Sequence, residues 1–273
     1  MKSMLDGAGS LLAGLLILIA FAFLIVPLLV AITMSFDART FLGPFPPKEF
    51  SLHWYEDFFS SQYYLKGLAI SITVSLLATG LAVLVGVSMA VMVDRTSFPG
   101  KKLLVNLFLA PLIVPAVVIG FALLLFLSRI GVHDGFWRLL AGHLIVAIPY
   151  TFRTTLVSLS GIPRAYVEVA QSLGANERQA FWDVTLPLAR TGIAAGAVFA
   201  LAFSMDDASL SMFLSDPNAY TLPVAMLSMM RANFDLTIAA AAVVLILITI
   251  ALIVLLDRLI GLERVIGQGI YRG

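Results

Sequence analysis

The most constraining feature of this sequence is a set of long apolar runs that contain no charged side chain. About 20 apolar residues in a row are enough for a helix to cross the hydrocarbon core of a membrane. Four runs reach that length without a charge, at residues 11–32, 67–93, 103–128 and 236–256. Only 12% of the residues are charged, which is about half the share usual in a soluble domain. The sequence therefore predicts an all-α integral membrane protein.

Two more segments qualify as membrane spans although each carries a charge. Residues 138–160 contain Arg153, and residues 188–212 contain Asp206 and Asp207. The first apolar run is longer than the core of a secretory signal, which has about 7–15 residues, so we interpret it as a retained helix. The expected spans are about 11–33, 67–93, 103–128, 138–160, 188–212 and 236–257.

The distribution of Lys and Arg sets the orientation of the spans, because cytosolic loops are enriched in these residues. More of them fall on the side of the N-terminus than on the opposite side. This places both termini and the segment 161–187 in the cytosol, and the segment 34–66 outside as an extracytoplasmic cap. The cytosolic residues are Lys2, Arg95, Lys101, Lys102, Arg164, Arg178, Arg190, Arg258, Arg264 and Arg272.

Prolines and aromatic residues add detail to this plan. Pro111, Pro115 and Pro149 fall inside expected spans, where proline removes a hydrogen bond and bends the helix. The cap 34–66 is rich in proline and aromatic residues, and two interpretations of it stay open. It is either a docking face for an extracytoplasmic partner or an aromatic anchor at the membrane interface. The aromatic residues are Phe41, Phe45, Trp54, Tyr55, Phe58 and Phe59.

Several kinds of chemistry have no support in the sequence. The chain has no cysteine, which excludes disulfides and zinc–thiolate sites. His53, His133 and His143 are scattered and form no metal-binding pattern, so we interpret each as a loop or interface residue. No phosphate-binding glycine loop and no nucleophile–base constellation is present. We expect a protein that is not an enzyme and that binds no metal or cofactor itself.

The longest cytosolic loop that the expected topology predicts is the polar segment 164–187, RAYVEVAQSLGANERQAFWDVTLP. Pro163 is suited to the start of a helix, and Gly174 to its end. A second helix is expected to begin near Glu177. The small residues Ala165 and Ala170 allow a partner to approach closely. An amphipathic hairpin lying on the membrane surface is the alternative.

This segment resembles the EAA loop of membrane permeases in type I ABC importers. The resemblance implies a six-helix permease fold in which the loop is a coupling helix that docks on a cytosolic ATPase. Val169 and Val184 depart from the family pattern by small changes of volume. The residues implied in ATPase coupling are Glu168, Ala170, Gly174, Leu186 and Pro187.

A finer resemblance, over about residues 20–256, is to spermidine/putrescine-type permeases. It includes PLIVPAVVIGFALLLF, FALAFSMDDASLSMF and TLPVAMLSMMR. It implies import of polyamines or other small amine-bearing solutes, such as opines or aminophosphonates, across a bacterial inner membrane. The implied partners are an ATPase dimer that binds ATP and Mg, a second permease or a copy of this chain, and an extracytoplasmic solute-binding protein. Lipid surrounds the chain, and nucleic acid is not implied.

Asp206 and Asp207 are the candidates for a substrate pathway or gate. A charge at mid-membrane costs at least about 2.5–3.5 kcal/mol, so it usually faces a cavity or a partner. The structural alternative is that Asp206 caps a broken helix while Asp207 is exposed. For the whole chain, the alternative function is a self-contained secondary carrier or channel for small cations, which typically shows internal repeats.

Overall fold

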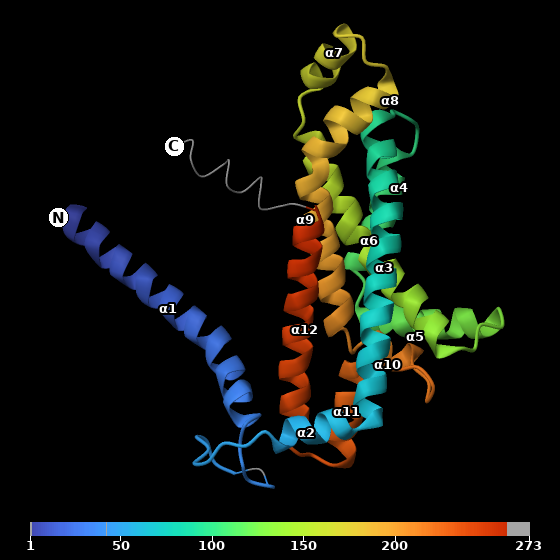
Figure 1. Ribbon diagram of the computed structural model, residues 1–273. Helices are drawn as coiled ribbons and strands as arrows, with labels where there is room; N and C mark the ends of the chain where they lie inside the picture. Colours follow the sequence, from blue (N-terminus) through green and yellow to red (C-terminus); the bar gives the residue numbers. More distant parts are fainter. Residues whose placement is uncertain (1, 42, 261–273) are drawn as a thin grey trace. The chain divides into compact units, whose positions relative to one another are not determined.

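The computed structural model describes residues 2–41 and 43–260 (Figure 1). These residues form helices and two isolated β-bridges, with no longer strand among them. The all-α prediction is confirmed. Arg264 and Arg272, which the orientation argument uses, lie outside the described residues. The described residues divide into two compact units, one holding those up to Gln62 with Met229–Val244, and the other holding Tyr63–Ser228 with the described residues that follow Val244.

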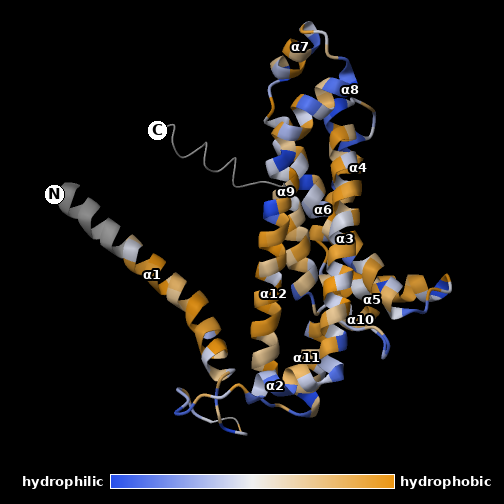
Figure 2. Ribbon diagram, viewed as in Figure 1, coloured by the Kyte–Doolittle hydropathy of each residue, from blue (hydrophilic) through white to orange (hydrophobic). Residues whose placement is uncertain are grey.

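Among the described residues, five helices are long and apolar enough to cross a membrane, or up to six if one bent pair counts as a single span. The hydropathy colouring of Figure 2 shows these helices as mainly hydrophobic, whereas the loop that carries α7 (Arg164–Ser172) and α8 (Glu177–Ala180) is mixed. Four of these helices lie in α1 (Lys2–Met34), α3 (Gln62–Arg95), α6 (Gly135–Ser160) and α12 (Thr237–Ile260). The remaining one runs from Glu177 to Asp206 and ends with α9 (Leu186–Asp206).

The segment 103–128 differs from the single span that its apolar run predicts. It contains α4 (Lys101–Leu109), the 3-10 turn Ala110–Leu112 and α5 (Ala116–Arg129), and the two arms meet at an angle of 102°. Pro115 lies outside the helix, directly before α5, with an extended ψ of 135°. The residue before a proline disfavours helical backbone, so a helix ends there readily. Pro149, in contrast, stays inside α6.

The first unit is held together around Asp37, which follows α1. The carboxylate of Asp37 forms an ion pair with Arg39, and this hydrogen-bonded partner lowers the pKa of Asp37 below its usual value. The indole N–H of Trp54, in α2 (His53–Ser60), donates to the Asp37 carbonyl at 2.8 Å. Ser35 and Tyr55 are hydrogen-bonded at 2.7 Å. The segment predicted as a cap thus has a short helix and its own polar contacts.

In the second unit, α6 and α9 pack closely because glycines allow their backbones to approach. A Cβ on Gly196 of α9 would lie 2.3 Å from Thr154 Oγ1 of α6. A Cβ on Gly86 of α3 would lie 2.0 Å from Thr151 Oγ1, whose hydroxyl donates to the Ala82 carbonyl at 2.6 Å. Each of these positions excludes any larger side chain, so the three helices form a tight bundle.

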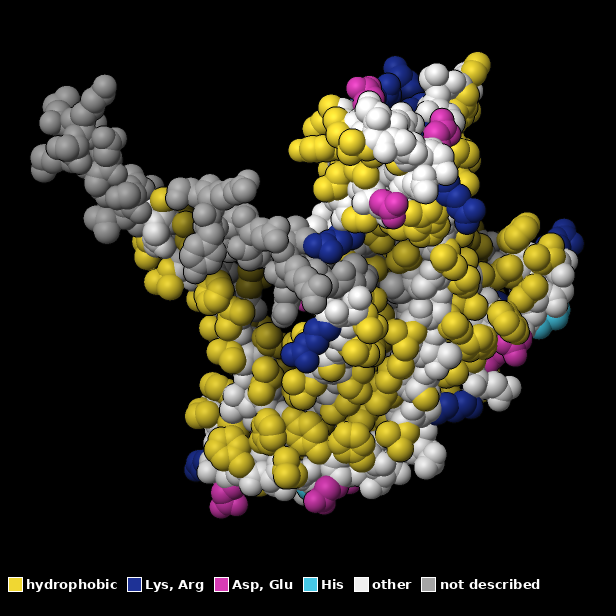
Figure 3. Space-filling view, turned by 45° about the horizontal axis from the view of Figure 1, so that its top comes forward, with side chains coloured by type: hydrophobic (Ala, Val, Ile, Leu, Met, Phe, Trp, Pro, Cys, Tyr) yellow, Lys and Arg dark blue, Asp and Glu magenta, His cyan; other side chains and the backbone are white. Residues whose placement is uncertain are grey.

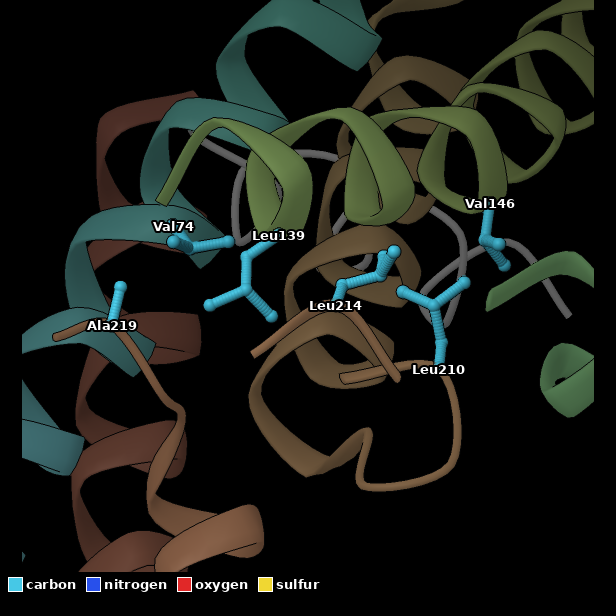
Figure 4. Close-up of a cluster of buried hydrophobic side chains, with 6 residues drawn as sticks. All are labelled: Val74, Leu139, Val146, Leu210, Leu214 and Ala219. Atoms are coloured by element: carbon cyan, nitrogen blue, oxygen red, sulfur yellow. The ribbon is translucent and has the colours of Figure 1, made fainter. Parts of the chain in front are cut away.

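A buried hydrophobic cluster surrounds the short helix α10 (Ser211–Leu214), which follows α9. Figure 4 shows its side chains converging from α3, from α6 and from the chain around α10. α11 (Leu222–Ala232) follows this region. The cluster is composed of Val74, Leu139, Val146, Leu210, Leu214 and Ala219.

Candidate functional site

The candidate coupling loop consists of α7 (Arg164–Ser172), α8 (Glu177–Ala180) and the π-helical turn Phe181–Thr185, which leads into α9. Figure 3 shows Lys, Arg, Asp and Glu side chains gathered at this end of the second unit, while hydrophobic side chains cover much of its helical body. α7 begins and ends, and α8 begins, close to the positions that the sequence predicts.

Gly174 ends α7 because it adopts a backbone conformation that other residues rarely take. Its φ is +96°. The Gly174 N–H donates to the Gln171 carbonyl at 2.9 Å, and the Ala175 N–H donates to the Ala170 carbonyl at 3.0 Å. This pair of bonds is a Schellman motif, in which glycine supplies the left-handed residue. The predicted role of Gly174 as the end of the helix therefore has a direct structural reason.

The second helix of the loop begins with a capping box that the sequence analysis did not identify. Asn176 Oδ1 accepts from the Gln179 N–H at 2.9 Å, and Gln179 Oε1 accepts from the Asn176 N–H at 2.9 Å. The two bonds satisfy backbone donors at the start of α8. The spacing of Asn and Gln three residues apart was the sequence signal for this cap.

The outer face of α7 and the residue that directly follows it carry an exposed apolar stripe, which we define as Tyr166, Val169 and Leu173. Their exposed fractions are 55%, 58% and 85%. Residues three and four positions apart lie on one face of a helix, so these side chains form a continuous ridge. A contiguous group of exposed apolar side chains marks a surface that binds another protein or the membrane. The sequence analysis favoured the small residues of α7 for docking and missed this stripe.

The structure separates the predicted coupling residues into two places. Glu168 is exposed and lines an open cavity of about 460 Å³ beside α7, whose other residues include Arg95 and Thr185. Ala170 and Gly174 lie toward the end of α7. The other two predicted residues, Leu186 and Pro187, lie in the first turn of α9, beyond the π-helical turn. Their part in ATPase coupling remains a prediction.

The acidic pair lies at the other end of α9, where the helix breaks. Asp206 is the last helical residue and is exposed. Asp207 has extended backbone and is 8% exposed. Its carboxylate accepts from the Leu210 N–H at 3.3 Å, the Ser211 N–H at 2.9 Å and the Ser211 hydroxyl at 3.0 Å.

The structural roles of the two acids are therefore the reverse of those in the structural alternative that the sequence left open. Asp207 caps the chain that starts α10, and Asp206 is exposed. The physical reason is that a capping residue needs non-helical backbone, so that its side chain can turn back to N–H groups further along the chain. Asp207, just beyond the end of α9, meets this condition and Asp206 does not.

His143 joins the same network from α6, and its interpretation as a loop or interface residue was wrong. It is fully buried. Its Nδ1 is hydrogen-bonded to Ser204 Oγ at 2.6 Å, and its Nε2 to Ser211 Oγ at 2.9 Å. Ser211 thus connects His143 to Asp207, and the network ties together α6, α9 and α10. The signal for this role was a histidine inside an otherwise apolar span, since such residues usually face a polar partner.

The loop that joins α10 to α11 is fixed by Asp216. Burial raises the pKa of Asp216, but backbone N–H groups of Ala219, Asn218 and Gly135, together with the charge of Arg138, lower it by more, so the net pKa is below the usual value. The bond from the Gly135 N–H is 2.7 Å long and fastens the start of α6 to this loop. Within the described residues, no group of three or more His, Asp or Glu side chains is placed to hold a metal ion.

These features define a class of protein: a helical membrane protein with a structured helical loop at one end of a span and a polar break at the other. The chain belongs to the family described as the binding-protein-dependent transport system inner membrane component, whose model matches residues 82–262. It is therefore a permease, the non-catalytic membrane component of an ABC transporter. This membership fits the importer interpretation and does not fit a self-contained carrier or channel.

Individual relatives agree with the finer resemblance. The spermidine/putrescine transport system permease protein PotC of Haemophilus influenzae is 29% identical over 237 residues, which cover 87% of this chain and 91% of the relative. The putrescine transport system permease protein PotI of Escherichia coli is 28% identical over 235 residues, which cover 83% of each.

A solved structure shows the fold. It is the crystal structure of a bacterial alginate ABC transporter in complex with an alginate pentasaccharide-bound periplasmic protein. The match has a TM-score of 0.70 at 18% sequence identity and covers 93% of this chain and 94% of that chain. The chain therefore has the permease fold of type I ABC importers.

Proposed function

We propose that this chain forms half of the translocation pathway of an importer for small amine-bearing solutes, and that α7 is its coupling helix. The observation that supports α7 as the coupling helix is the exposed stripe of Tyr166, Val169 and Leu173. The stripe lies on a short helix whose end is fixed by Gly174, so it presents a preformed ridge to a cleft in a partner. Preformed elements lose little freedom on binding.

In this proposal the partners are two cytosolic ATPase subunits, a second permease or a copy of this chain, and an extracytoplasmic solute-binding protein. ATP and Mg bind to the ATPases, and this chain holds no cofactor. The α7 end of the second unit faces the cytosol, in agreement with the positive-inside rule, and both termini are cytosolic. Closure of the ATPases moves the coupling helices and switches the pathway between outward-facing and inward-facing states.

We infer the class of cargo from two observations. The relatives PotC and PotI are named as transporters of spermidine and putrescine. In this chain, Asp206 presents an exposed carboxylate at the break after α9. An exposed carboxylate attracts an ammonium group by charge–charge attraction. Polyamines are therefore the first cargo to test, followed by opines and aminophosphonates.

The coupling proposal is tested by affinity capture of the tagged chain from its own host in mild detergent, followed by mass spectrometry. Leu173→Asp places a charge at the most exposed point of the stripe, and Gln171→Ala changes an exposed residue on another face of α7. We expect wild type and Gln171→Ala to bring down an ATPase and a second permease, and Leu173→Asp to lose the ATPase alone. Retention of the ATPase by Leu173→Asp at wild-type stoichiometry contradicts the proposal.

A further inference from the structure

We propose that Arg95, the last residue of α3, is a positioning residue that fixes the π-helical turn Phe181–Thr185 and thereby ties the coupling loop to α3. The guanidinium carbon of Arg95 lies 4.7 Å from the centroid of the Phe181 ring. Its Nη2 donates to Thr185 Oγ1 at 3.3 Å. One side chain thus contacts both ends of the turn. The inference rests on the proposed coupling function of the loop.

The two contacts together require arginine. A guanidinium group is flat, so it can stack on an aromatic ring while its N–H groups point outward in the same plane. The ammonium group of lysine is compact and cannot make both contacts from one position. Arg95 forms no ion pair within the described residues, so its charge is directed at the ring and at the hydroxyl group.

Thr185 extends this connection through the turn. Its side chain is buried, with an exposed fraction of 6%. The Thr185 hydroxyl accepts from Arg95 and donates to the Ala180 carbonyl at 3.4 Å. A continuous hydrogen-bonded path therefore runs from the end of α3 through Thr185 to the last residue of α8.

The π-helical turn connects the coupling loop to the membrane helices. π-helical turns are rare, and inside α-helices they occur mostly at functional sites. This one lies directly between α8 and α9. Because Arg95 holds the turn from α3, a displacement of the loop moves the ends of α3 and α9 together. Without Arg95, the loop still binds the ATPase through its stripe, but α3 no longer follows.

The test uses the complete transporter, with both permeases, the ATPases and the binding protein, reconstituted in proteoliposomes. ATP hydrolysis and putrescine uptake are measured side by side for Arg95→Ala, Arg95→Lys, Phe181→Leu and the Arg95→Ala/Phe181→Leu double variant. We expect each single variant to lower uptake per ATP by about two- to five-fold, the range expected for an exposed cation–π contact. The control is Lys102→Ala, which removes an exposed cation close to Arg95 in sequence. It should leave the ratio of uptake to ATP hydrolysis unchanged.

The double variant decides whether the two residues act as one unit. If they do, it is no worse than Arg95→Ala alone, because one contact cannot be lost twice. Arg95→Lys should fall between wild type and Arg95→Ala. Additive losses, or a parallel fall of hydrolysis and uptake that leaves their ratio at the wild-type value, overturn the proposal.

A structural measurement covers the case in which Arg95→Ala assembles poorly. The chain has no native cysteine, so spin labels at Ser97→Cys and Arg178→Cys report the distance between the end of α3 and α8. We expect this distance distribution to broaden in Phe181→Leu and not in Lys102→Ala. An unchanged distribution refutes the proposal that Arg95 fixes the π-helical turn. If Leu173→Asp fails to release the ATPase, the proposed coupling function itself is wrong. If only the Arg95 variants leave the ratio of uptake to hydrolysis unchanged, the positioning role of Arg95 alone is refuted.

Discussion

Replacing Asp207 by alanine is expected to destabilise the permease, whereas replacing its neighbour Asp206 is not. Asp207 is buried and accepts three hydrogen bonds, two of them from the backbone N–H groups of Leu210 and Ser211. Asp206 is exposed at the end of α9. The two substitutions remove the same side chain from adjacent positions, so any difference between them reports the environment of the carboxylate.

The magnitude for Asp207→Ala follows from the bonds that are lost. Loss of a capping side chain costs about 1 kcal/mol. A buried backbone donor left without an acceptor adds about 1–3 kcal/mol. The Ser211 hydroxyl keeps His143 as a partner at 2.9 Å, so it adds little. The expected loss of stability is therefore about 2–4 kcal/mol, with the Ser211 N–H as the main unsatisfied group.

The assay is thermal unfolding of the purified permease in detergent, with wild type and both variants heated at the same rate, because irreversible unfolding makes the midpoint depend on the rate. Asp207→Asn keeps one capping oxygen and should lie between wild type and Asp207→Ala. Equal midpoints for Asp206→Ala and Asp207→Ala, or a lower midpoint for Asp206→Ala, would refute the division of roles between the two acids.

Three further predictions concern transport, packing and pH. Asp206→Asn should lower uptake of labelled putrescine in proteoliposomes without moving the unfolding midpoint; unchanged uptake removes Asp206 from the pathway. Gly196→Val should lower the free energy of unfolding by an overpacking cost of about 1–3 kcal/mol or more, and with it the midpoint, because its Cβ would meet Thr154 Oγ1 at 2.3 Å. Gly80→Val, with open space around it, is the control, and equal shifts contradict the packing argument. The lowered pKa of Asp216 stabilises the fold at pH values above the ordinary pKa of an aspartate, and this contribution is lost as the pH falls through the lower pKa of the folded state. Midpoints measured from pH 6 to about pH 3 should fall less in Asp216→Asn than in wild type, and parallel curves would show that Asp216 contributes nothing.

Most of the long apolar helices and the loop helices were predictable because local features determine them. Charge-free apolar runs indicate membrane spans directly. Pro163 and Gly174 mark the start and end of α7 by their backbone preferences, and the structure has the helix between them. The exposed stripe on α7 follows the same helical spacing, so it too was open to sequence reasoning once that helix was placed.

The helix break and the bent segment depend on contacts between residues far apart in the sequence. The end of α9 decides which of the two adjacent aspartates has non-helical backbone. Near this end, Ser204 and Ser211 are hydrogen-bonded to His143, which is 61 and 68 residues away from them in sequence. Pro115 indicates that a helix is interrupted, but the 102° angle between its arms also depends on what packs against them. Gly120 in α5 approaches the Leu210 carbonyl so closely that a Cβ would lie 2.9 Å from it. No local pattern specifies such a contact.

The two candidate sites of this permease lie at opposite ends of one helix. α9 has 21 residues, and at about 1.5 Å per residue it separates the π-helical turn from the break at Asp206 by about 30 Å. Its glycines hold it against α6 with no room for a larger side chain, and close-packed helices move as rigid bodies rather than deforming. His143 of α6 is bonded at the break itself. We therefore expect a displacement of the candidate coupling loop to move α6 and α9 as one body, together with the carboxylate of Asp206 at the far end of α9.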